Sequence, residues 1–425
     1  MRLSWFSVFS CLLAAMALGF TACGDDDDDD GGGGGGGEFG DSATIYSSLP
    51  LQGASRPQTT AMVNGIELAL KQADNKAGDL TIEYESLDDS TAQAGSWTPE
   101  ATSANARRAA QDENAIAYLG EFNSGASAVS IPILNEGGLA QISPANTAVG
   151  LTTDEPGADA GEPDKYYPTG NRHYVRIVPK DTIQGAALAT VMDQDGCTSI
   201  AVLNDREVYG AGLARNIVAS AEEIGLEVVS NDGIDKNAAN YRSLAQRANQ
   251  AGADCMVYSG ITANNAVQIF KDFAAALPNA QLYGPDGVAE SAFADPGEGG
   301  IPADVASRTK VTVATLSPDE YPPEGQKFFE DFEAEYGEAN PDPYAIYGYE
   351  AMSLAIDAIT RAQEEGDLTK QSVIDALFAT QGRESVLGTY DIDENGDTTL
   401  TDYGVYSIEG GELSFNETVQ AQAGE

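Results

Sequence analysis

The sequence predicts an α/β protein with two lobes, each built on a parallel sheet. Short apolar strands alternate with amphipathic helices from residue 41 onward, which is typical of a parallel sheet covered by helices on both faces. A Gly-, Pro- and Asp-rich stretch at 152–170 interrupts the alternation, which then restarts. The length of 425 residues suits two domains of roughly 100–200 residues each and an N-terminal extension.

The first series of elements runs from residue 43 to residue 143. Its strands are expected at 43–49, 80–87, 115–119 and 139–143. Its helices are expected at 58–76, at 100–113 directly after Pro99, and at 125–136. The helix at 58–76 places Met62, Ile66 and Leu70 on one face, as a helix that packs on a sheet requires.

The second series repeats the pattern and the chain then returns. Strands are expected at 199–203, 227–231, 254–259 and 281–284, with helices at 210–224, 241–250 and 263–277. After a strand at 311–314 come helices at 323–336, 343–363 and 369–381 and strands around Tyr390, Val405 and Leu413. This return suits lobes that exchange strands across a hinge. The predicted lobes are 41–176 with 312–400, and 177–311 with 401–425.

The negative charge of the chain argues against nucleic acid as a partner. The chain carries 67 acidic against 22 basic side chains, a net charge of −45, so the phosphate backbone of a nucleic acid would repel it. A well-hydrated surface is the ordinary explanation, and life in high salt stays an alternative.

Few residues are suited to catalysis. His173, in a predicted strand between the lobes, is the only histidine, which leaves little material for a Ser/His/Asp triad or a histidine-rich metal site. The sequence contains no phosphate-binding Gly-x-x-x-x-Gly-Lys-Ser/Thr motif. We expect no catalytic residues, no metal and no cofactor.

The N-terminus has the pattern of a bacterial lipoprotein signal. Arg2 precedes an apolar stretch at 3–20, and Phe20-Thr21-Ala22-Cys23-Gly24 follows, with phenylalanine where leucine is usual. A transmembrane helix is the alternative, but no basic flank follows to stop transfer. We predict that 1–23 is the signal with its lipobox, that Cys23 is lipidated, and that the Asp/Gly-rich segment 24–40 is a flexible linker. The protein would be exported and held at the membrane by its lipid anchor.

Two cysteines remain in the body of the chain. Cys197 and Cys255 each begin or adjoin a predicted strand of the second lobe, and neighbouring parallel strands bring their starts close together. An exported protein retains disulfides, so we predict a bond between these two residues; two buried free thiols are the alternative.

Six motifs together resemble a known family. They are LPLQG at 49–53, GIELA at 65–69, GEFNSGAS at 120–127, ISPANT at 142–147, YGAG at 209–212 and GPDGV at 284–288. In this order and spacing the chain resembles, over about 43–415, the leucine/isoleucine/valine-binding proteins of the type I periplasmic-binding fold. The resemblance implies two Rossmann-like lobes joined by a multi-crossing hinge. It also implies the substrate-binding component of an ABC importer, which delivers an amino acid to a permease and ATPase complex.

The residues that would hold the ligand's charged groups follow predicted strands. In open parallel sheets ligands bind beyond the carboxyl ends of the strands, where helix N-termini lie. Asn123 and Ser124 stand at such a junction; Ser124 either caps the helix, offers its hydroxyl to a carboxylate, or does both.

The resemblance implies roles for residues in two further loops. The Ala145 carbonyl would accept from the ligand ammonium and Thr147 would hold the carboxylate, with Asn146 between them. An ordinary turn at Pro144 is the alternative there.

From the second lobe, the resemblance implies that Asp286 pairs with the ammonium, as a shorter side chain than the usual glutamate. Tyr209 would close over the ligand. A turn residue at Asp286 and ordinary packing at Tyr209 are the alternatives.

The side-chain pocket departs from the family. Phe122 would form part of an apolar wall, Ile261 stands where an aromatic contact is common, and Gln58 stands where a tyrosine can lie. The residues that would bind the amino and carboxyl groups thus match the family, whereas the pocket for the ligand's side chain differs. Leucine, isoleucine or valine is the leading hypothesis for the ligand. A sensory receptor of the same fold and an exported enzyme are the alternative functions.

One segment resembles the first half of a calcium loop. Residues 391–396 read DIDENG, and Asp402 stands eleven positions after Asp391. The twelfth position is aspartate instead of glutamate and no flanking helix pair is evident, so we favour a plain hairpin.

Overall fold

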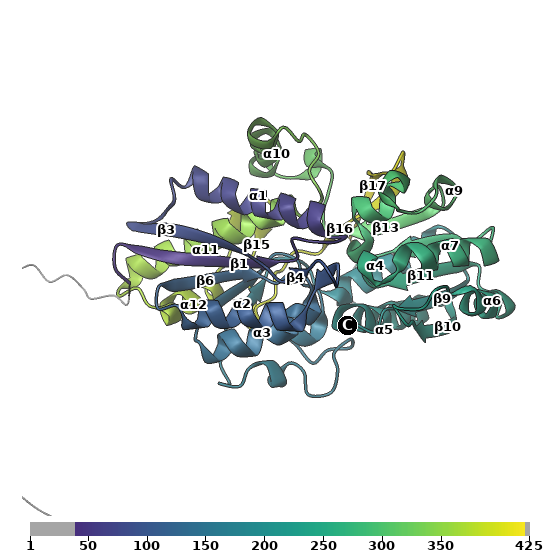
Figure 1. The fold of residues 1–425 in the computed structure, drawn as a ribbon, viewed down its shortest axis with the longest axis horizontal. Helices are drawn as coiled ribbons and strands as arrows, with labels where there is room; N and C mark the ends of the chain where they lie inside the picture. Colours follow the sequence, from purple (N-terminus) through teal and green to yellow (C-terminus); the bar gives the residue numbers. More distant parts are fainter. Residues whose placement is uncertain (1–38, 421–425) are drawn as a thin grey trace, which may run out of the picture. The chain divides into compact units, whose positions relative to one another are not determined.

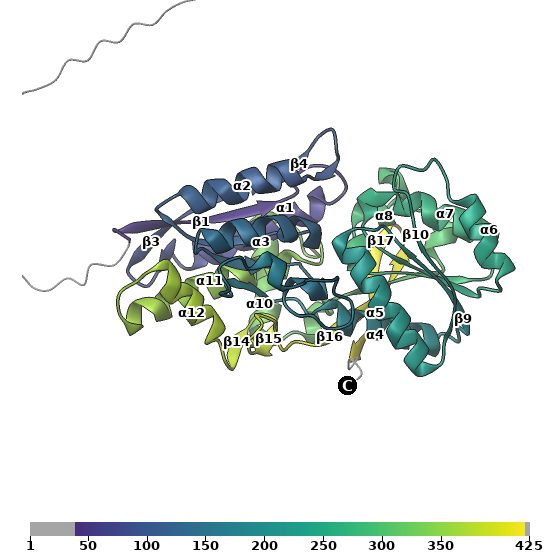
Figure 2. The ribbon, with the colours of Figure 1, turned by 90° about the horizontal axis from the view of Figure 1, so that it is seen from below.

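The computed structural model describes residues 39–420. The predicted signal, the lipidation site at Cys23 and almost all of the linker lie outside the described residues. Two large sheets organise the described part (Figures 1 and 2), with strand orders β2-β3-β1-β6-β7-β8 and β10-β9-β11-β12-β13-β16-β17. The predicted α/β fold class is confirmed.

The six-stranded sheet and its helices are called the first lobe. Its strands are β1 (Ser42–Leu49), β2 (Lys76–Ala77), β3 (Leu80–Asp88), β6 (Ala115–Gly120), β7 (Ala140–Ser143) and β8 (Tyr174–Arg176). All neighbours pair in parallel except β2 with β3. Its helices are α1 (Arg56–Gln72), α2 (Pro99–Gln111), α3 (Ser124–Glu136), α10 (Pro323–Tyr336), α11 (Ala345–Glu365) and α12 (Lys370–Phe378). Figure 1 shows α1 on one side of this sheet and α2 and α3 on the other.

The seven-stranded sheet and its helices are called the second lobe. Its strands are β9 (Ser199–Asn204), β10 (Glu227–Gly233), β11 (Cys255–Ser259), β12 (Gln281–Gly284), β13 (Thr309–Val313), β16 (Asp402–Glu409) and β17 (Glu412–Gln420). The strands β16 and β17 are antiparallel to their neighbours. Its helices are α4 (Asp181–Gln194), α5 (Val208–Ile224), α6 (Arg242–Gln250), α7 (Ala266–Ala276), α8 (Ser291–Ala294) and α9 (Ala303–Ala306).

The central strands are mostly apolar because both faces of each sheet are covered. Every residue of β6 and of β11 is buried. These runs carry no alternation of polar and apolar residues, as expected for parallel strands between two layers of helices.

The chain passes between the lobes after β8, after β13 and before β16. A buried ion pair stands at the first crossing: Nε of Arg176 lies 2.7 Å from Oδ1 of Asp397, and the side chains are 0% and 6% exposed. Arg176 also donates to the carbonyl of Ala148 at 2.7 Å. These bonds tie the end of β8 to the loop before β16.

The segment resembling a calcium loop folds back on itself. An antiparallel bridge joins Ile392 to Thr398, and Oδ1 of Asp393 accepts from the backbone N–H groups of Asn395 and Asp397, each at 2.8 Å. Asp397 itself pairs with Arg176. The hairpin interpretation agrees with this arrangement.

Two elements differ from the sequence prediction. The helix expected at 58–76 ends at Gln72, because Asp74 and Asn75 adopt positive φ values of 55° each, a conformation that these residue types tolerate and that stops a helix. The helix α4 was not predicted. Nine of its residues are buried, on all sides, so it lacks the one-sided apolar pattern by which a surface helix is recognised.

Smaller differences concern the C-terminal half. The helix expected at 263–277 is split into a turn at Thr262–Asn264 and α7, because Asn265 is left-handed with φ of 72°. The strand expected around Tyr390 is β15 (Gly388–Tyr390), which pairs with β14 (Arg383–Ser385) in a separate two-stranded sheet.

The structure joins Cys197 to Cys255 in a disulfide, with their Cα atoms 5.9 Å apart. The two cysteines stand at the starts of the neighbouring strands β9 and β11, which pair in parallel. The predicted bond is therefore present. Within 39–420 no helix combines the length and the apolar character that crossing a bilayer demands.

Candidate binding pocket between the lobes

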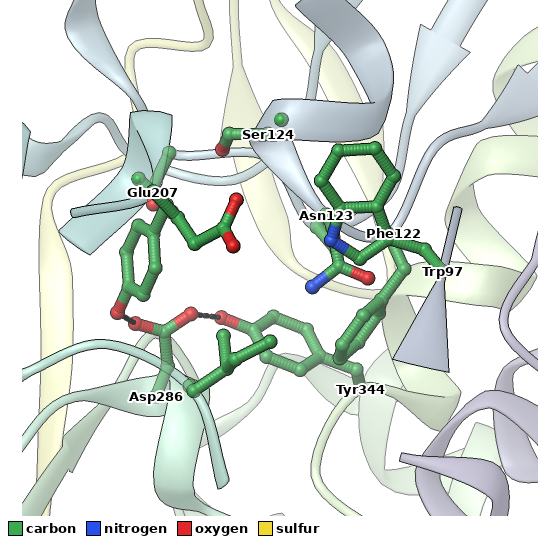
Figure 3. A pocket seen from close by; sticks show the side chains of 13 residues that line it. Trp97, Phe122, Asn123, Ser124, Glu207, Asp286 and Tyr344 are labelled. Carbon is green, nitrogen blue, oxygen red and sulfur yellow. Dashed lines mark hydrogen bonds between the residues drawn. The ribbon is translucent and has the colours of Figure 1, made fainter. Parts of the chain in front are cut away.

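A pocket that opens to solvent lies where loops of the two lobes meet. The first lobe contributes the β6–α3 junction and the loop after β7. The second lobe contributes the start of α5 and the loops after β11 and β12. The lining residues are Trp97, Phe122, Asn123, Ser124, Gly125, Ala145, Thr147, Glu207, Tyr209, Ile261, Asp286, Gly287 and Tyr344 (Figure 3).

Most of the residues singled out from the sequence meet in this pocket. They are Phe122, Asn123, Ser124, Ala145, Thr147, Tyr209, Ile261 and Asp286. All follow the carboxyl ends of parallel strands, so two sheets that face each other bring together residues more than 150 positions apart.

Asn146 and Gln58 do not line the pocket. The side-chain amide of Asn146 donates to the carbonyls of Glu121 at 3.1 Å and Phe122 at 2.9 Å, so it holds the β6–α3 loop in place. Gln58 is fully buried in α1, and neither atom of its amide has a hydrogen-bond partner among the residues described.

Asp286 is held from both sides by tyrosines. It accepts from the hydroxyl of Tyr209 at 2.6 Å and from that of Tyr344 at 2.9 Å (Figure 3), and it is 6% exposed. Burial raises the pKa of Asp286, and hydrogen bonds from the two tyrosines offset part of that rise. Burial also raises the pKa of both tyrosines, so they stay protonated and donate. The result is a carboxyl group oriented for a cationic partner.

The N-terminus of α3 lies in the opposite wall. Ser124 is the first residue of the helix, and no side chain caps it, so the cap interpretation of Ser124 is wrong. The Ser124 hydroxyl accepts weakly from the backbone N–H of Ala148 at 3.4 Å, which leaves it able to donate. A helix N-terminus attracts anions through its free N–H groups and its dipole. One wall therefore suits a cation and the other an anion.

The family model of periplasmic binding proteins matches residues 45–412, most of the chain. The chain belongs to the periplasmic binding protein family. The family predicted from the sequence motifs is confirmed.

The chain resembles several other proteins of this family. It is 25% identical over 295 residues to the Leu/Ile/Val-binding protein homolog 1 of Brucella suis, covering 69% of this chain and 72% of that protein. The structure of a leucine-binding protein from Thermotoga maritima superposes with a TM-score of 0.75 at 21% identity, over 89% of this chain and 99% of that one. A solute-binding protein from R. palustris in complex with benzoate superposes with a TM-score of 0.71 at 21% identity, over 90% and 98% of the chains. The latter two show that the fold is shared.

A second buried carboxyl group stands behind the pocket of this periplasmic binding protein. Asp181 is the first residue of α4, is 0% exposed, and has no hydrogen-bond partner for either carboxyl oxygen within 39–420. Its backbone N–H donates to the carbonyl of Thr147 at 2.8 Å. Burial and the negative charge of Asp286 raise the pKa of Asp181 well above its usual range, which favours its protonated form. Sequence reasoning missed it because it missed α4.

The β6–α3 loop rests on a buried acid pair. Glu121 accepts from the Tyr118 hydroxyl at 2.8 Å, and its backbone N–H donates to Oγ of Ser127 at 3.1 Å. Burial raises the pKa of Glu121 and, together with the charge of Glu121, that of the neighbouring Asp89. Burial thus favours the protonated form of both carboxyls.

Three further lining residues escaped the sequence analysis. Trp97 ends β5 (Ser96–Trp97), which pairs with β4 (Ser90–Thr91). A Cβ at Gly125 would lie 2.7 Å from the Trp97 ring, so the glycine lets the indole pack over the start of α3. Glu207 directly precedes α5 and Tyr344 directly precedes α11. A signal for Trp97 was present, since it is the only tryptophan after Trp5.

The histidine and the cysteine cluster, residue types common in catalytic and metal sites, have structural roles here. Burial lowers the pKa of His173 to about 3, and its Nδ1 lies 2.9 Å from Nδ2 of Asn135, so the ring is neutral and structural. In the described part of the chain, one group has the spacing of metal ligands: Cys197, Asp254 and Cys255. Its two cysteines form the disulfide and offer no thiolate.

Proposed function

We propose that this protein is the extracytoplasmic substrate-binding component of an ABC importer and that it binds an amino acid, or a related small zwitterion, between its two lobes. The observation that carries the proposal is that one wall of the pocket suits a cation and the opposite wall suits an anion. Asp286 faces it from the second lobe, and Ser124 with the N-terminus of α3 faces it from the first.

In this proposal Asp286 receives the ligand ammonium, with the Ala145 carbonyl as a second acceptor. Ser124, Thr147 and the first N–H groups of α3 receive the carboxylate. Asn123 and Phe122 flank this grip, while Tyr209 and Ile261 approach from the second lobe. Such charge-assisted hydrogen bonds are about twice as strong as neutral ones. The names of the relatives, among them leucine-binding proteins, support an amino acid.

Carboxylic acids without an amino group fit less well. The similar protein from R. palustris holds benzoate, but no lysine or arginine of the described part of this chain lines the pocket. Asp286 would then stand buried without a counter-charge, which is costly. We therefore expect benzoate to bind weakly or not at all.

Ligand binding would close the lobes. We propose that 41–176 with 312–400 moves as one body and 177–311 with 401–425 as the other, and that a ligand touching both bodies favours the closed state. A permease with its ATPase would recognise that state, while lipidated Cys23 and the linker 24–40 keep the protein at the membrane. We propose no catalytic role, because the only histidine is buried and neutral.

Calorimetric titration of the full chain, purified in detergent, with the twenty amino acids and benzoate tests the proposal. At least one amino acid should bind. Both Asp286→Asn and Thr147→Val should weaken it about tenfold or more, since a hydrogen bond to a charged group is lost. Asp304→Asn, an exposed change in α9 of the same lobe, is the control.

Unchanged affinity in both pocket variants, with unchanged melting temperatures, would remove this site from the proposal. Binding of benzoate in place of every amino acid would contradict the assignment of a zwitterion.

A further inference from the structure

The pocket has more acidic character than an aliphatic amino acid needs. Besides Asp286, the carboxylate of Glu207 lines it, and Figure 3 shows this carboxylate and the side-chain amide of Asn123 pointing into the same space. The two come from different lobes: Asn123 precedes α3 and Glu207 precedes α5.

Glu207 has hydrogen-bonding capacity left. Its Oε1 accepts a hydrogen bond from Nζ of Lys236 at 2.8 Å, and the side chains of Glu207 and Lys236 are 26% and 48% exposed. Within 39–420 no other side chain or N–H group donates to this carboxylate. The lysine side chain is 48% exposed and contacts Oε1 alone, which leaves Oε2 without a donor among the described residues.

Asn123 has an unsatisfied acceptor. The residue is 8% exposed, and its Oδ1 is buried with no hydrogen-bond partner in the described chain. An unpaired buried acceptor is unfavourable, and a donor from a ligand would remove the penalty. Asn123 and Glu207 thus each have an oxygen that can accept a hydrogen bond from an N–H group.

Aromatic rings complete this part of the pocket. Trp97, Phe122 and Tyr344 line it, and no basic side chain of residues 39–420 does. Ring faces attract cations, whereas an aliphatic side chain would desolvate Glu207 and leave Asn123 unpaired.

We propose that the ligand's side chain carries a nitrogen group with N–H donors, which Glu207 and Asn123 receive beside the ring of Trp97. A basic amino acid supplies such a group as a cation, and an amide amino acid supplies it in neutral form. The inference rests on the proposed function, because it takes the grip on the amino and carboxyl groups as given.

The first test compares ligands with and without a nitrogen group on the side chain. The full chain, purified in detergent, is titrated with L-lysine, L-arginine, L-glutamine, L-leucine and L-norleucine, which is lysine without its terminal ammonium. Lysine, arginine or glutamine should bind at least about tenfold more tightly than norleucine and leucine, the factor expected of one hydrogen bond to a charged group. A decrease in affinity with added salt distinguishes the cation from the amide.

The second test separates a ligand contact from a structural ion pair. Glu207→Gln should weaken the nitrogen-bearing ligand about tenfold and leave norleucine within about twofold. Lys236→Ala should strengthen the binding of the nitrogen-bearing ligand, because it frees the carboxylate of Glu207. The matched control is Glu223→Gln, an exposed change at the other end of α5.

Each outcome decides between the proposals. Equal or tighter binding of leucine and norleucine would overturn the inference and leave the proposed function standing. Equal losses in Glu207→Gln and Lys236→Ala would show a structural ion pair and also overturn it. If no amino acid binds, the proposed function itself fails.

Discussion

The stability of the protein should depend on pH through Glu290, a buried acid of the second lobe. Glu290 follows β12 and is 2% exposed, and one of its carboxyl oxygens lacks a partner among the described residues. Burial raises its pKa from 4.5 to about 7, although hydrogen bonds with Ser55 and Thr262 oppose the rise. Because Ser55 directly precedes α1 of the first lobe, Glu290 spans the boundary between the lobes.

Because the pKa of Glu290 is raised, the free energy of unfolding should fall as the pH rises. The folded protein holds the Glu290 proton more tightly than the unfolded chain, so this contribution to the free energy of unfolding is complete below pH 4.5. It declines as the pH rises and is lost above about pH 7. At 1.36 kcal/mol per pKa unit, the rise from 4.5 to about 7 corresponds to about 3 kcal/mol.

Urea unfolding of the wild-type protein and of Glu290→Gln, followed by circular dichroism from pH 4.5 to pH 8, measures this contribution. The glutamine imitates the protonated acid at every pH. The free energy of unfolding of the wild type should therefore fall relative to the variant by about 3 kcal/mol across the range. Glu364→Gln, an exposed change near the end of α11, should follow the wild type. Parallel curves for the wild type and Glu290→Gln would refute the reasoning.

Two further predictions concern stability. Asp397→Asn should lower the free energy of unfolding in urea by roughly 3–5 kcal/mol, because it leaves the buried guanidinium of Arg176 without its counter-charge; a loss below about 1 kcal/mol, as for surface pairs, would contradict that. Reduction of the Cys197–Cys255 bond, which spans 58 residues, should cost about 4 kcal/mol in the chain-entropy model. The melting temperature should then fall with added dithiothreitol in the wild type and stay constant in Cys197→Ala, and an equal response in both would contradict the second prediction.

Much of the fold was predictable because its main signal is local. The strands β6 and β11 are short, mostly apolar runs that are buried throughout, and between amphipathic helices such runs indicate a parallel sheet. The same rule failed for α4, which is buried on all sides and has no polar face. The end of α1 was misplaced because positive φ at Asp74 and Asn75 leaves little trace in the sequence.

The candidate site was predictable only in part. Ser124, Thr147 and Asp286 belong to motifs that follow strands, so a family resemblance locates them. Trp97 and Glu207 belong to no such motif. The small β4–β5 sheet brings Trp97 over the start of α3, while Glu207 reaches the pocket from the other lobe. Contacts that form only where two lobes meet have no sequence period by which to find them.

The charges around the pocket together determine which ligand it can select. Burial and the charge of Asp286 raise the pKa of Asp181 and so favour its uncharged form, and its carboxyl oxygens have no hydrogen-bond partner within 39–420. The lining acids are Asp286 and Glu207, and no base among the residues that the structure describes lines the pocket. A zwitterion with a neutral side chain offsets only one of the two, whereas a basic amino acid offsets both and an acidic one adds repulsion. The net charge of −45 acts in the same direction at long range, since a negative protein draws cations toward it in low salt. The affinity for basic, neutral and acidic side chains should therefore fall in that order, and added salt should weaken the first most.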